Sequence, residues 1–124
     1  MGIEFDGGLT CALGVSNLDA AIAWYTDVLG CALIYKVAET GWCELTTSVE
    51  RVRIGLGENL ERGGRGGATL TFGVTDIGAA KAALAEKRVR LDGDIIEVPG
   101  LARLLTFYDP DDNALMFYQE LQAG

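Results

Sequence analysis

The first half of the chain alternates between strand-like and helix-like spacing of its apolar residues. Residues 9–15 form a short apolar run that is typical of a buried strand. Either Ser16 or Asn17 can then cap a helix, whose apolar residues recur at helical spacing until Gly30 ends it. The strand-like segments that follow are residues 32–37, 42–47 and 52–56. The pattern therefore predicts a β-α-β-β-β unit.

The second half of the chain repeats this order. Residues 68–74 have the pattern of a strand, and Asp76 caps a helix that runs from Ile77 to about Lys87. The strand-like segments that follow are residues 94–98, 101–108 and 114–119. The segment 109–113, Asp-Pro-Asp-Asp-Asn, has the composition of a hairpin turn. Its carboxylates lack the glycine and the closing glutamate of a calcium loop, so a turn is the favoured interpretation.

The two halves are similar to each other in sequence as well as in pattern. Residues 10–21 read Thr-Cys-Ala-Leu-Gly-Val-Ser-Asn-Leu-Asp-Ala-Ala, and residues 69–80 read Thr-Leu-Thr-Phe-Gly-Val-Thr-Asp-Ile-Gly-Ala-Ala, at a constant offset of 59 (69 − 10). An offset of this size fits two supersecondary units better than a solenoid. We therefore predict an α+β fold in a single domain, residues 1–124. Its expected parts are a first βαβββ module at 8–60, a flexible glycine-rich linker at 61–67 and a second βαβββ module at 68–121.

Composition narrows the expected partners and the expected compartment. The net charge of −8, from 18 acidic and 10 basic residues, disfavours nucleic-acid binding and favours a cationic or neutral ligand. No apolar run approaches the roughly 18–20 residues of a membrane-spanning helix, and the N-terminus lacks the pattern of a signal peptide, so we expect no membrane partner. The three cysteines have no CxxC spacing, and we interpret them as small buried residues in a reducing cytoplasm. Histidine is absent.

Two segments carry a resemblance to a known family. Residues 15–30, Val-Ser-Asn-Leu-Asp-Ala-Ala-Ile-Ala-Trp-Tyr-Thr-Asp-Val-Leu-Gly, and residues 107–117, Phe-Tyr-Asp-Pro-Asp-Asp-Asn-Ala-Leu-Met-Phe, resemble the vicinal oxygen chelate superfamily. This superfamily includes glyoxalases, extradiol dioxygenases, fosfomycin-resistance enzymes and bleomycin-resistance proteins. The resemblance extends over residues 8–120 and implies two βαβββ modules whose curved mixed sheets enclose a cavity, usually in a homodimer. It says little about chemistry, because the superfamily contains several enzyme reactions and some pure binding proteins.

The resemblance also implies positions for a divalent metal ion, and this sequence departs from the family at each of them. Metal-dependent members place ligands at positions that correspond here to Thr10, Gly55, Thr69 and Met116. These residues do not offer the carboxylate or imidazole donors that such a cation needs. We therefore expect neither a metal nor another cofactor.

Side chains alternate along a strand, so the same positions predict which residues line the implied cavity. The residues expected to face inward on the outer strands are Thr10, Ala12, Arg53, Gly55, Gly57, Thr69, Thr71, Ala114, Met116 and Tyr118. On the central strands, the better of two registers turns inward Cys43, Leu45, Thr47, Leu104, Thr106 and Tyr108, with Trp42 near the rim. The residues that we expect to contact a ligand are Thr10, Trp42, Cys43, Arg53, Thr69, Thr106, Tyr108, Met116 and Tyr118.

Some of these residues also have a purely structural interpretation. Tyr108 and Tyr118 could pack with their hydroxyls at the solvent edge. Arg53 could be a solvated strand residue, and Trp42 could cover a loop. The pocket interpretation rests on their convergence on one face, not on any of them singly.

Two classes of function are open. The favoured hypothesis is a metal-free binding protein of the glyoxalase/bleomycin-resistance type that sequesters a small aromatic molecule, cationic or neutral, in antibiotic resistance or natural-product binding. The alternative is an enzyme that works without a metal, either a lyase or isomerase or a divergent glyoxalase- or dioxygenase-like protein. Its candidate reacting groups are the tyrosines, Glu44 and Cys43. Because histidine is absent, the commonest way of activating such a nucleophile is missing.

Overall fold

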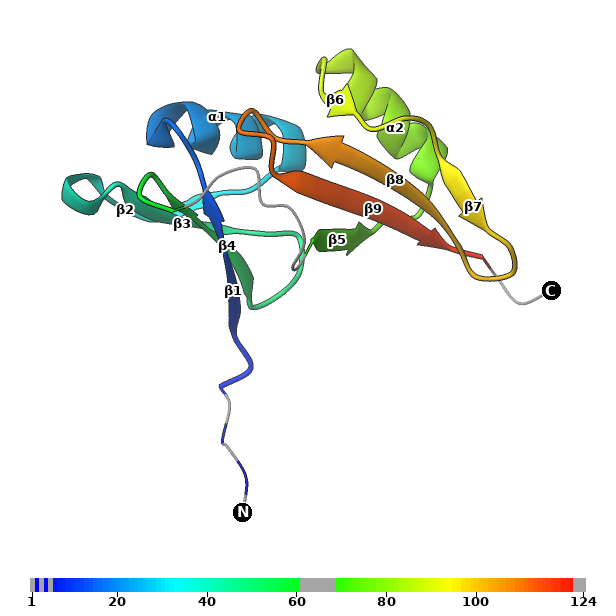
Figure 1. Cartoon of the computed structure of the whole chain (residues 1–124). Helices are drawn as coiled ribbons and strands as arrows, with labels where there is room; N and C mark the ends of the chain where they lie inside the picture. The colour runs from blue at the N-terminus through cyan, green and yellow to red at the C-terminus, as the bar shows by residue number, and fades with distance from the viewer. Residues whose placement is uncertain (1, 3, 5, 61–68, 122–124) are drawn as a thin grey trace. The chain divides into compact units, whose positions relative to one another are not determined.

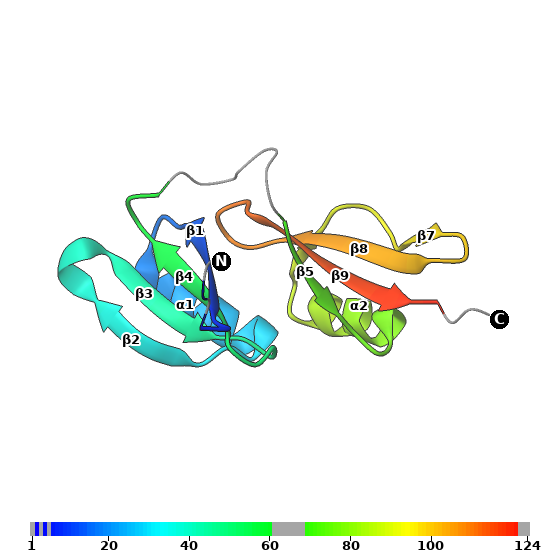
Figure 2. The same cartoon turned by 90° about the horizontal axis from the view of Figure 1, so that it is seen from below.

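The computed structural model describes residues 2, 4, 6–60 and 69–121, and the chain divides into two units, residues 1–62 and 63–124. Each unit consists of a mixed β-sheet with one long helix against one face (Figures 1 and 2), which is the predicted α+β class. No helix in the described ranges is long and apolar enough to cross a membrane. The expected linker at 61–67 lies outside the described residues. The cavity that the resemblance implies stays a prediction.

The first unit has the predicted β-α-β-β-β order. Its elements are β1 (Leu9–Gly14), α1 (Leu18–Leu29), β2 (Leu33–Val37), the short 3-10 helix η1 (Ala38–Thr40), β3 (Trp42–Thr46) and β4 (Val52–Gly57). The strands lie in the order β1-β4-β3-β2, in which β1 runs parallel to β4 and the other neighbours are antiparallel. Figure 2 shows the four strands side by side with α1 behind them.

Local sequence determines where α1 begins and ends. Of the two candidate caps, Asn17 is the one used, since its Oδ1 accepts a hydrogen bond from the Ala20 backbone N at 2.9 Å. Gly30 has a φ of 71°, the left-handed conformation predicted for the residue after the last turn. The residue after β4 supplies a further acceptor, because the Glu58 carboxylate accepts a hydrogen bond from the Leu18 backbone N at 2.7 Å.

The core of the first unit lies between α1 and the sheet. Its buried side chains come from one stripe of α1, from the residue directly after β1 and from alternate positions of β3 and β4. They are Val15, Leu18, Ala21, Tyr25, Cys43, Leu45, Ile54 and Leu56. No described element of this unit covers the other face of the sheet (Figure 1), so the sheet has one covered and one open face.

The second unit repeats the order with one addition. Its elements are β5 (Leu70–Gly73), α2 (Ile77–Glu86), β6 (Arg90–Leu91), β7 (Ile96–Val98), β8 (Ala102–Tyr108) and β9 (Ala114–Glu120). The strand order is β5-β9-β8-β6, and β7 also pairs with β8. The sequence pattern does not predict β6, because two residues are too few to show alternation. Neither sheet closes on itself, since each strand order is an open path.

A buried carboxylate holds the turn between β8 and β9. Asp109 Oδ1 accepts hydrogen bonds from the backbone N of Asp111 at 2.9 Å and of Asn113 at 2.8 Å. Its Oδ2 accepts one from Asn113 Nδ2 at 2.8 Å. These bonds satisfy a carboxylate that is only 4% exposed. The hairpin-turn interpretation of residues 109–113 is therefore confirmed.

The strand registers confirm the internal repeat. Ala12 pairs with Gly55, and Thr71, which lies 59 residues after Ala12 (71 − 12), pairs with Met116. Gly55 and Met116 are therefore equivalent positions of the two units, as the sequence alignment predicts. The helix caps repeat as well, because Gln119 Oε1 accepts a hydrogen bond from the Ile77 backbone N at 2.7 Å, just as Glu58 does for α1.

Candidate functional site

The uncovered face of the first sheet, called here the first open face, gathers several of the predicted ligand contacts. Paired residues on neighbouring strands point to the same side of a sheet, so the registers identify the members of this face. They include Thr10, Ala12, Tyr35, Trp42, Glu44, Thr46, Arg53, Gly55 and Gly57. Thr10, Trp42 and Arg53 therefore lie on one surface.

The predicted register of β3 is wrong by one residue. Cys43 and Leu45 face α1, where both are fully buried, and Thr47 lies beyond the strand. The apolar side of α1 needs apolar partners, and β3 supplies them at these two positions, so the charged Glu44 between them must lie on the open face. Cys43 is thus covered by the helix. Burial also raises the pKa of its thiol, which keeps it protonated and poorly nucleophilic.

The Trp42 side chain lies over a glycine, and this glycine stands where the resemblance places a metal ligand. A Cβ atom added to Gly55 would be 2.2 Å from Trp42 Cη2 and 2.6 Å from Cζ2. A Cβ atom on Gly57 would be 3.2 Å from Trp42 Cε3. The two glycines of β4 therefore allow the indole to lie directly against the strand backbone. The result is a half-buried aromatic surface on the first open face.

Hydroxyl groups hold Glu44 in place beside this surface. Thr10 Oγ1 donates a hydrogen bond to Glu44 Oε1 at 3.1 Å, and Tyr35 OH donates one to Glu44 Oε2. Tyr35 OH accepts a hydrogen bond from Trp42 Nε1 at 3.0 Å. The bond to Glu44 raises the pKa of Tyr35 above its ordinary value, because loss of the proton would place two negative charges together. A continuous hydrogen-bond network thus joins Trp42, Tyr35, Glu44 and Thr10.

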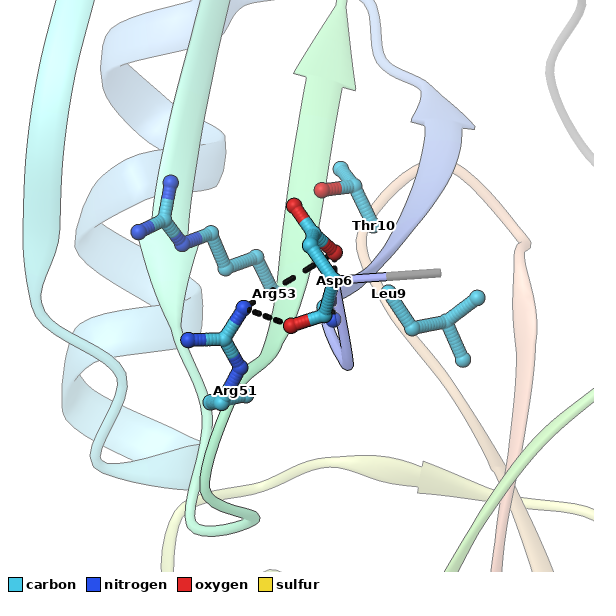
Figure 3. Close-up of a pocket in the computed structure, with 6 residues that line it drawn as sticks. Asp6, Leu9, Thr10, Arg51 and Arg53 are labelled. Carbon is cyan, nitrogen blue, oxygen red and sulfur yellow. Dashed lines mark hydrogen bonds and ion pairs between the residues drawn. The ribbon is translucent and has the colours of Figure 1, made fainter. Parts of the chain in front are cut away.

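A pocket of about 280 Å³ opens at the start of β1 (Figure 3). Its lining residues are Asp6, Gly8, Leu9, Thr10, Arg51 and Arg53. Arg51 donates a hydrogen bond to the Asp6 carbonyl oxygen, and its Nη2 lies 3.7 Å from Asp6 Oδ1. Arg53 extends from β4 and is exposed, and among the described residues it has no hydrogen-bond or ion-pair partner (Figure 3).

The uncovered face of the second sheet, the second open face, has the predicted register. Its members include Thr71, Gly73, Leu104, Thr106, Tyr108, Ala114, Met116 and Tyr118. The alternate residues Leu105, Phe107 and Leu115 are buried on the helix side. The residues of β8 and β9 that the sequence predicts to share one face therefore do share it. Thr69 precedes β5 and is exposed.

The two tyrosines of the second open face are covered differently. A Cβ atom on Gly73 would be 2.9 Å from Tyr118 Cζ, so Tyr118 lies over a glycine as Trp42 does in the first unit. The Arg90 guanidinium covers one side of the Tyr108 ring, 4.3 Å from its centroid. A hydrogen bond with Asp92 raises the pKa of Tyr108. Tyr118 is therefore the better candidate for a stacking contact.

The residues at the family's metal positions do not fit a divalent cation. Thr10 and Thr69 carry hydroxyls, Met116 carries a thioether and Gly55 has no side chain. Over the described part of the chain, no three His, Cys, Asp or Glu side chains gather closely enough to hold a metal ion. These four residues are therefore unsuited to chemistry that depends on a divalent cation.

Glu44 and Tyr35, the two members of the hydrogen-bond network that the predicted ligand contacts leave out, lie on the first open face. Glu44 is a candidate only in the enzyme hypothesis, although the repeat could have identified it: it pairs with Gly55 as Thr106 pairs with Met116. Tyr35 has no such signal. A register shift between Leu33 and Tyr35 turns it to this face, and sequence alternation does not reveal such a shift.

Comparison with known families places most of the chain in one of them. The family described as Glyoxalase/Bleomycin resistance protein/Dioxygenase superfamily matches residues 9–117. This range contains the whole first open face and all of the second except the last residues of β9. No curated protein matches the chain.

Solved structures share the fold over nearly the whole chain. An integron cassette protein from the mobile metagenome of Halifax Harbour Sewage Outfall is 27% identical, with 93% of this chain and 99% of that chain covered and a TM-score of 0.75. TnmS3, an antibiotic binding protein from Streptomyces sp. CB03234, is 22% identical, with 97% and 100% covered and a TM-score of 0.81. Lactoylglutathione lyase from Agrobacterium tumefaciens is 19% identical, with 94% and 95% covered and a TM-score of 0.73. The same fold thus occurs in a binding protein and in an enzyme.

Proposed function

The chain belongs to the glyoxalase/bleomycin resistance protein/dioxygenase superfamily, the vicinal oxygen chelate superfamily, and from this membership we propose that it is a binding protein that sequesters a small aromatic molecule without a metal ion. Antibiotic resistance or natural-product binding is the setting that we favour. The similar fold of TnmS3, which is an antibiotic binding protein, is consistent with this choice. The residues at the family's metal positions also favour binding without a metal ion, because they offer no suitable donor atoms.

The observation that carries the proposal is the place of the Trp42 ring. It occupies the space over Gly55, where a Cβ atom would be 2.2 Å from the ring, at a position that the family uses for a metal ligand. An aromatic surface therefore takes the place of a donor atom. Such a surface binds a planar molecule by stacking, and an aromatic pair contributes about 0.5–1.5 kcal/mol beyond the burial of its area.

The second open face supports the same ligand class. Tyr118 lies over Gly73, and Met116 and Thr106 are its half-buried neighbours on the ladder. A thioether adapts its shape to an aromatic ring and makes favourable contacts with it. Thr69 and Tyr108 stay in the proposed contact set, with Tyr108 already partly covered by Arg90.

The experiment is a fluorescence titration with nitrobenzyl alcohol, a neutral planar probe that quenches indole fluorescence on contact. A Trp24→Phe background leaves Trp42 as the remaining indole, since the chain has 2 tryptophans. We expect saturable quenching. In the natural background, followed by the amide shifts of the first unit, Trp42→Leu should weaken binding roughly twofold to tenfold, which corresponds to the loss of one stacking contact.

The matched control for this experiment is Trp24→Phe itself, because Trp24 lies on α1 and not on the open face. It should bind the probe as tightly as the natural chain. Quenching that rises linearly without saturation, together with equal amide shifts in Trp42→Leu, would contradict the proposal.

A second candidate function, an enzyme that works without a metal, is favoured by one observation. Glu44 is positioned on the first open face by hydrogen bonds from Thr10 and Tyr35, as a general base would be. This candidate predicts turnover of a lyase or isomerase substrate that is abolished in Glu44→Gln. The binding proposal instead predicts background rates in glyoxalase and dioxygenase assays, with or without added divalent metal.

We also propose that the protein is a cytoplasmic homodimer. The edge strand β2 supports self-association, because its Leu33 and Ile34 side chains are 47% and 39% exposed. The three cysteines are free, which suits a reducing compartment.

A further inference from the structure

Arg53 is an exposed cation on the first open face that no described residue engages in a hydrogen bond or an ion pair. It lines the pocket of about 280 Å³. Its strand neighbours on the same face are Thr10 and Thr46, so hydroxyl groups flank its stem. A guanidinium offers a planar fork of donors that matches the two oxygens of a carboxylate or a similar acidic group.

The other charged side chains near Arg53, which are Arg51, Asp6 and Glu44, already take part in hydrogen bonds or an ion pair. Arg51 is held by the Asp6 carbonyl and lies 3.7 Å from its carboxylate (Figure 3). Each oxygen of Glu44 accepts a hydroxyl hydrogen bond, from Thr10 and from Tyr35. No ion pair joins Glu44 or Asp6 to Arg53. The positive charge of Arg53 is therefore left for a group from outside this unit's described residues.

The aromatic surface and the guanidinium are close enough to meet one ligand. Arg53 and Gly55 are two residues apart on β4, hence on the same face and separated by roughly 7 Å of strand. The Trp42 ring lies over Gly55. A single substituted ring that stacks on Trp42 can thus place an acidic substituent at Arg53.

We propose that Arg53 is the subsite for an acidic group, and that the ligand of the first open face is an aromatic acid. This inference rests on the proposed binding function and names its ligand class. It also replaces the cationic preference that the net charge of −8 suggests. Charges beyond the Debye length of about 8 Å are largely screened at physiological ionic strength, so the charged groups of the face itself matter most. Of these, Glu44 already accepts two hydroxyl hydrogen bonds beside Gly55, and Arg53 offers donors that no described residue uses.

The test compares three probes that share one ring: nitrobenzoate, nitrobenzyl alcohol and nitrobenzylammonium. Binding is followed by the amide shifts of the first unit in two-dimensional NMR. We expect nitrobenzoate to bind about three to ten times more tightly than the alcohol, as one solvent-exposed charged contact permits, and the ammonium probe to bind most weakly. Added salt should weaken nitrobenzoate and leave the alcohol unchanged.

The variants are Arg53→Gln and its matched control Arg103→Gln. Each removes one positive charge, but Arg103 lies on β8, paired with Glu97 at 3.0 Å. Arg53→Gln should abolish the preference for nitrobenzoate, and Arg103→Gln should retain it. Arg53→Lys, which keeps the charge and loses the fork, should give an intermediate preference.

The outcomes separate this inference from the proposed function. Equal binding of the three probes, or a preference for nitrobenzoate that persists in Arg53→Gln, overturns the acidic subsite and leaves aromatic binding intact. Tighter binding of the ammonium probe also overturns it. If none of the probes shifts the amides of the first unit, the proposed function itself fails, and the inference that rests on it fails too.

Discussion

Gly55→Ala is the sharpest test of how the first open face is built. The added methyl group would lie 2.2 Å from Trp42 Cη2 and 2.6 Å from Cζ2, distances that real Cβ contacts do not reach. Either the indole leaves β4 or the strand backbone moves. If the indole leaves, it also loses the 3.0 Å hydrogen bond from Trp42 Nε1 to Tyr35 OH. The substitution therefore adds one methyl group, and the side chain that this group would collide with is Trp42.

Two opposing effects determine how far Gly55→Ala changes the free energy of unfolding. Overpacking of this kind lowers the free energy of unfolding by about 1–3 kcal/mol. In a Trp42→Ala background the collision partner is gone, and replacing a strand glycine by alanine should then stabilise by about 0.5–1 kcal/mol. The two substitutions should therefore couple by about 1.5–4 kcal/mol, far above the additivity error of distant sites.

The assay is equilibrium unfolding in urea, followed by tryptophan fluorescence. Trp24 and Trp42 both belong to the first unit, so the signal reports the unit that carries the substitution, and Trp24 still reports in the Trp42→Ala background. Gly73→Ala lies in the second unit, which contains no tryptophan, so its unfolding is followed by far-ultraviolet circular dichroism; its methyl group would meet Tyr118 at 2.9 Å, and it should cost less than Gly55→Ala. Strictly additive free energies for Gly55→Ala and Trp42→Ala would refute the placement of the ring.

Three further predictions concern the network, the metal and the assembly. Glu44→Gln should lower the pKa of Tyr35, because the Glu44 carboxylate is what raises it. The pKa is measured from the ultraviolet absorbance of tyrosinate against pH, after the titration curve of Tyr35→Phe is subtracted. A Tyr35 titration curve that is the same with and without Glu44→Gln contradicts the network. Because the folded pKa of Tyr35 is raised, its contribution to stability is complete below the ordinary tyrosine pKa of about 10 and is lost as the pH rises through the folded value. Metal analysis of dialysed protein should find far less than one divalent ion per chain, and a stoichiometric ion refutes the metal-free proposal. Light scattering should give about twice the chain mass of 13.2 kDa, whereas a monomer mass at tens of micromolar would exclude the dimer.

The sequence alone determined the elements and their order, because the signals for these are local. The Asn17 cap, the left-handed Gly30 and the buried Asp109 of the hairpin turn each act within a few residues of the chain. The repeat aligned Gly55 with Met116, and the ladders confirm that alignment. The departure from the family's metal positions is likewise a property of residue identity.

Tertiary structure decided which face of a strand meets a ligand. Alternation places Cys43 on the same face as Leu45, and Trp42 on the same face as Glu44, but it does not say which pair faces the helix. Packing against α1 decides this, because the apolar pair is buried beneath the helix. The shift that turns Tyr35 toward Glu44 arises from pairing between β2 and β3, not from the order of residues in β2. The same is true of Arg53: its charge is visible in the sequence, but its lack of a partner depends on hydroxyl groups from other strands that occupy Glu44. Which residues of a strand share a face is a local property of the chain, whereas the surroundings of that face are set by the strands and the helix packed around it.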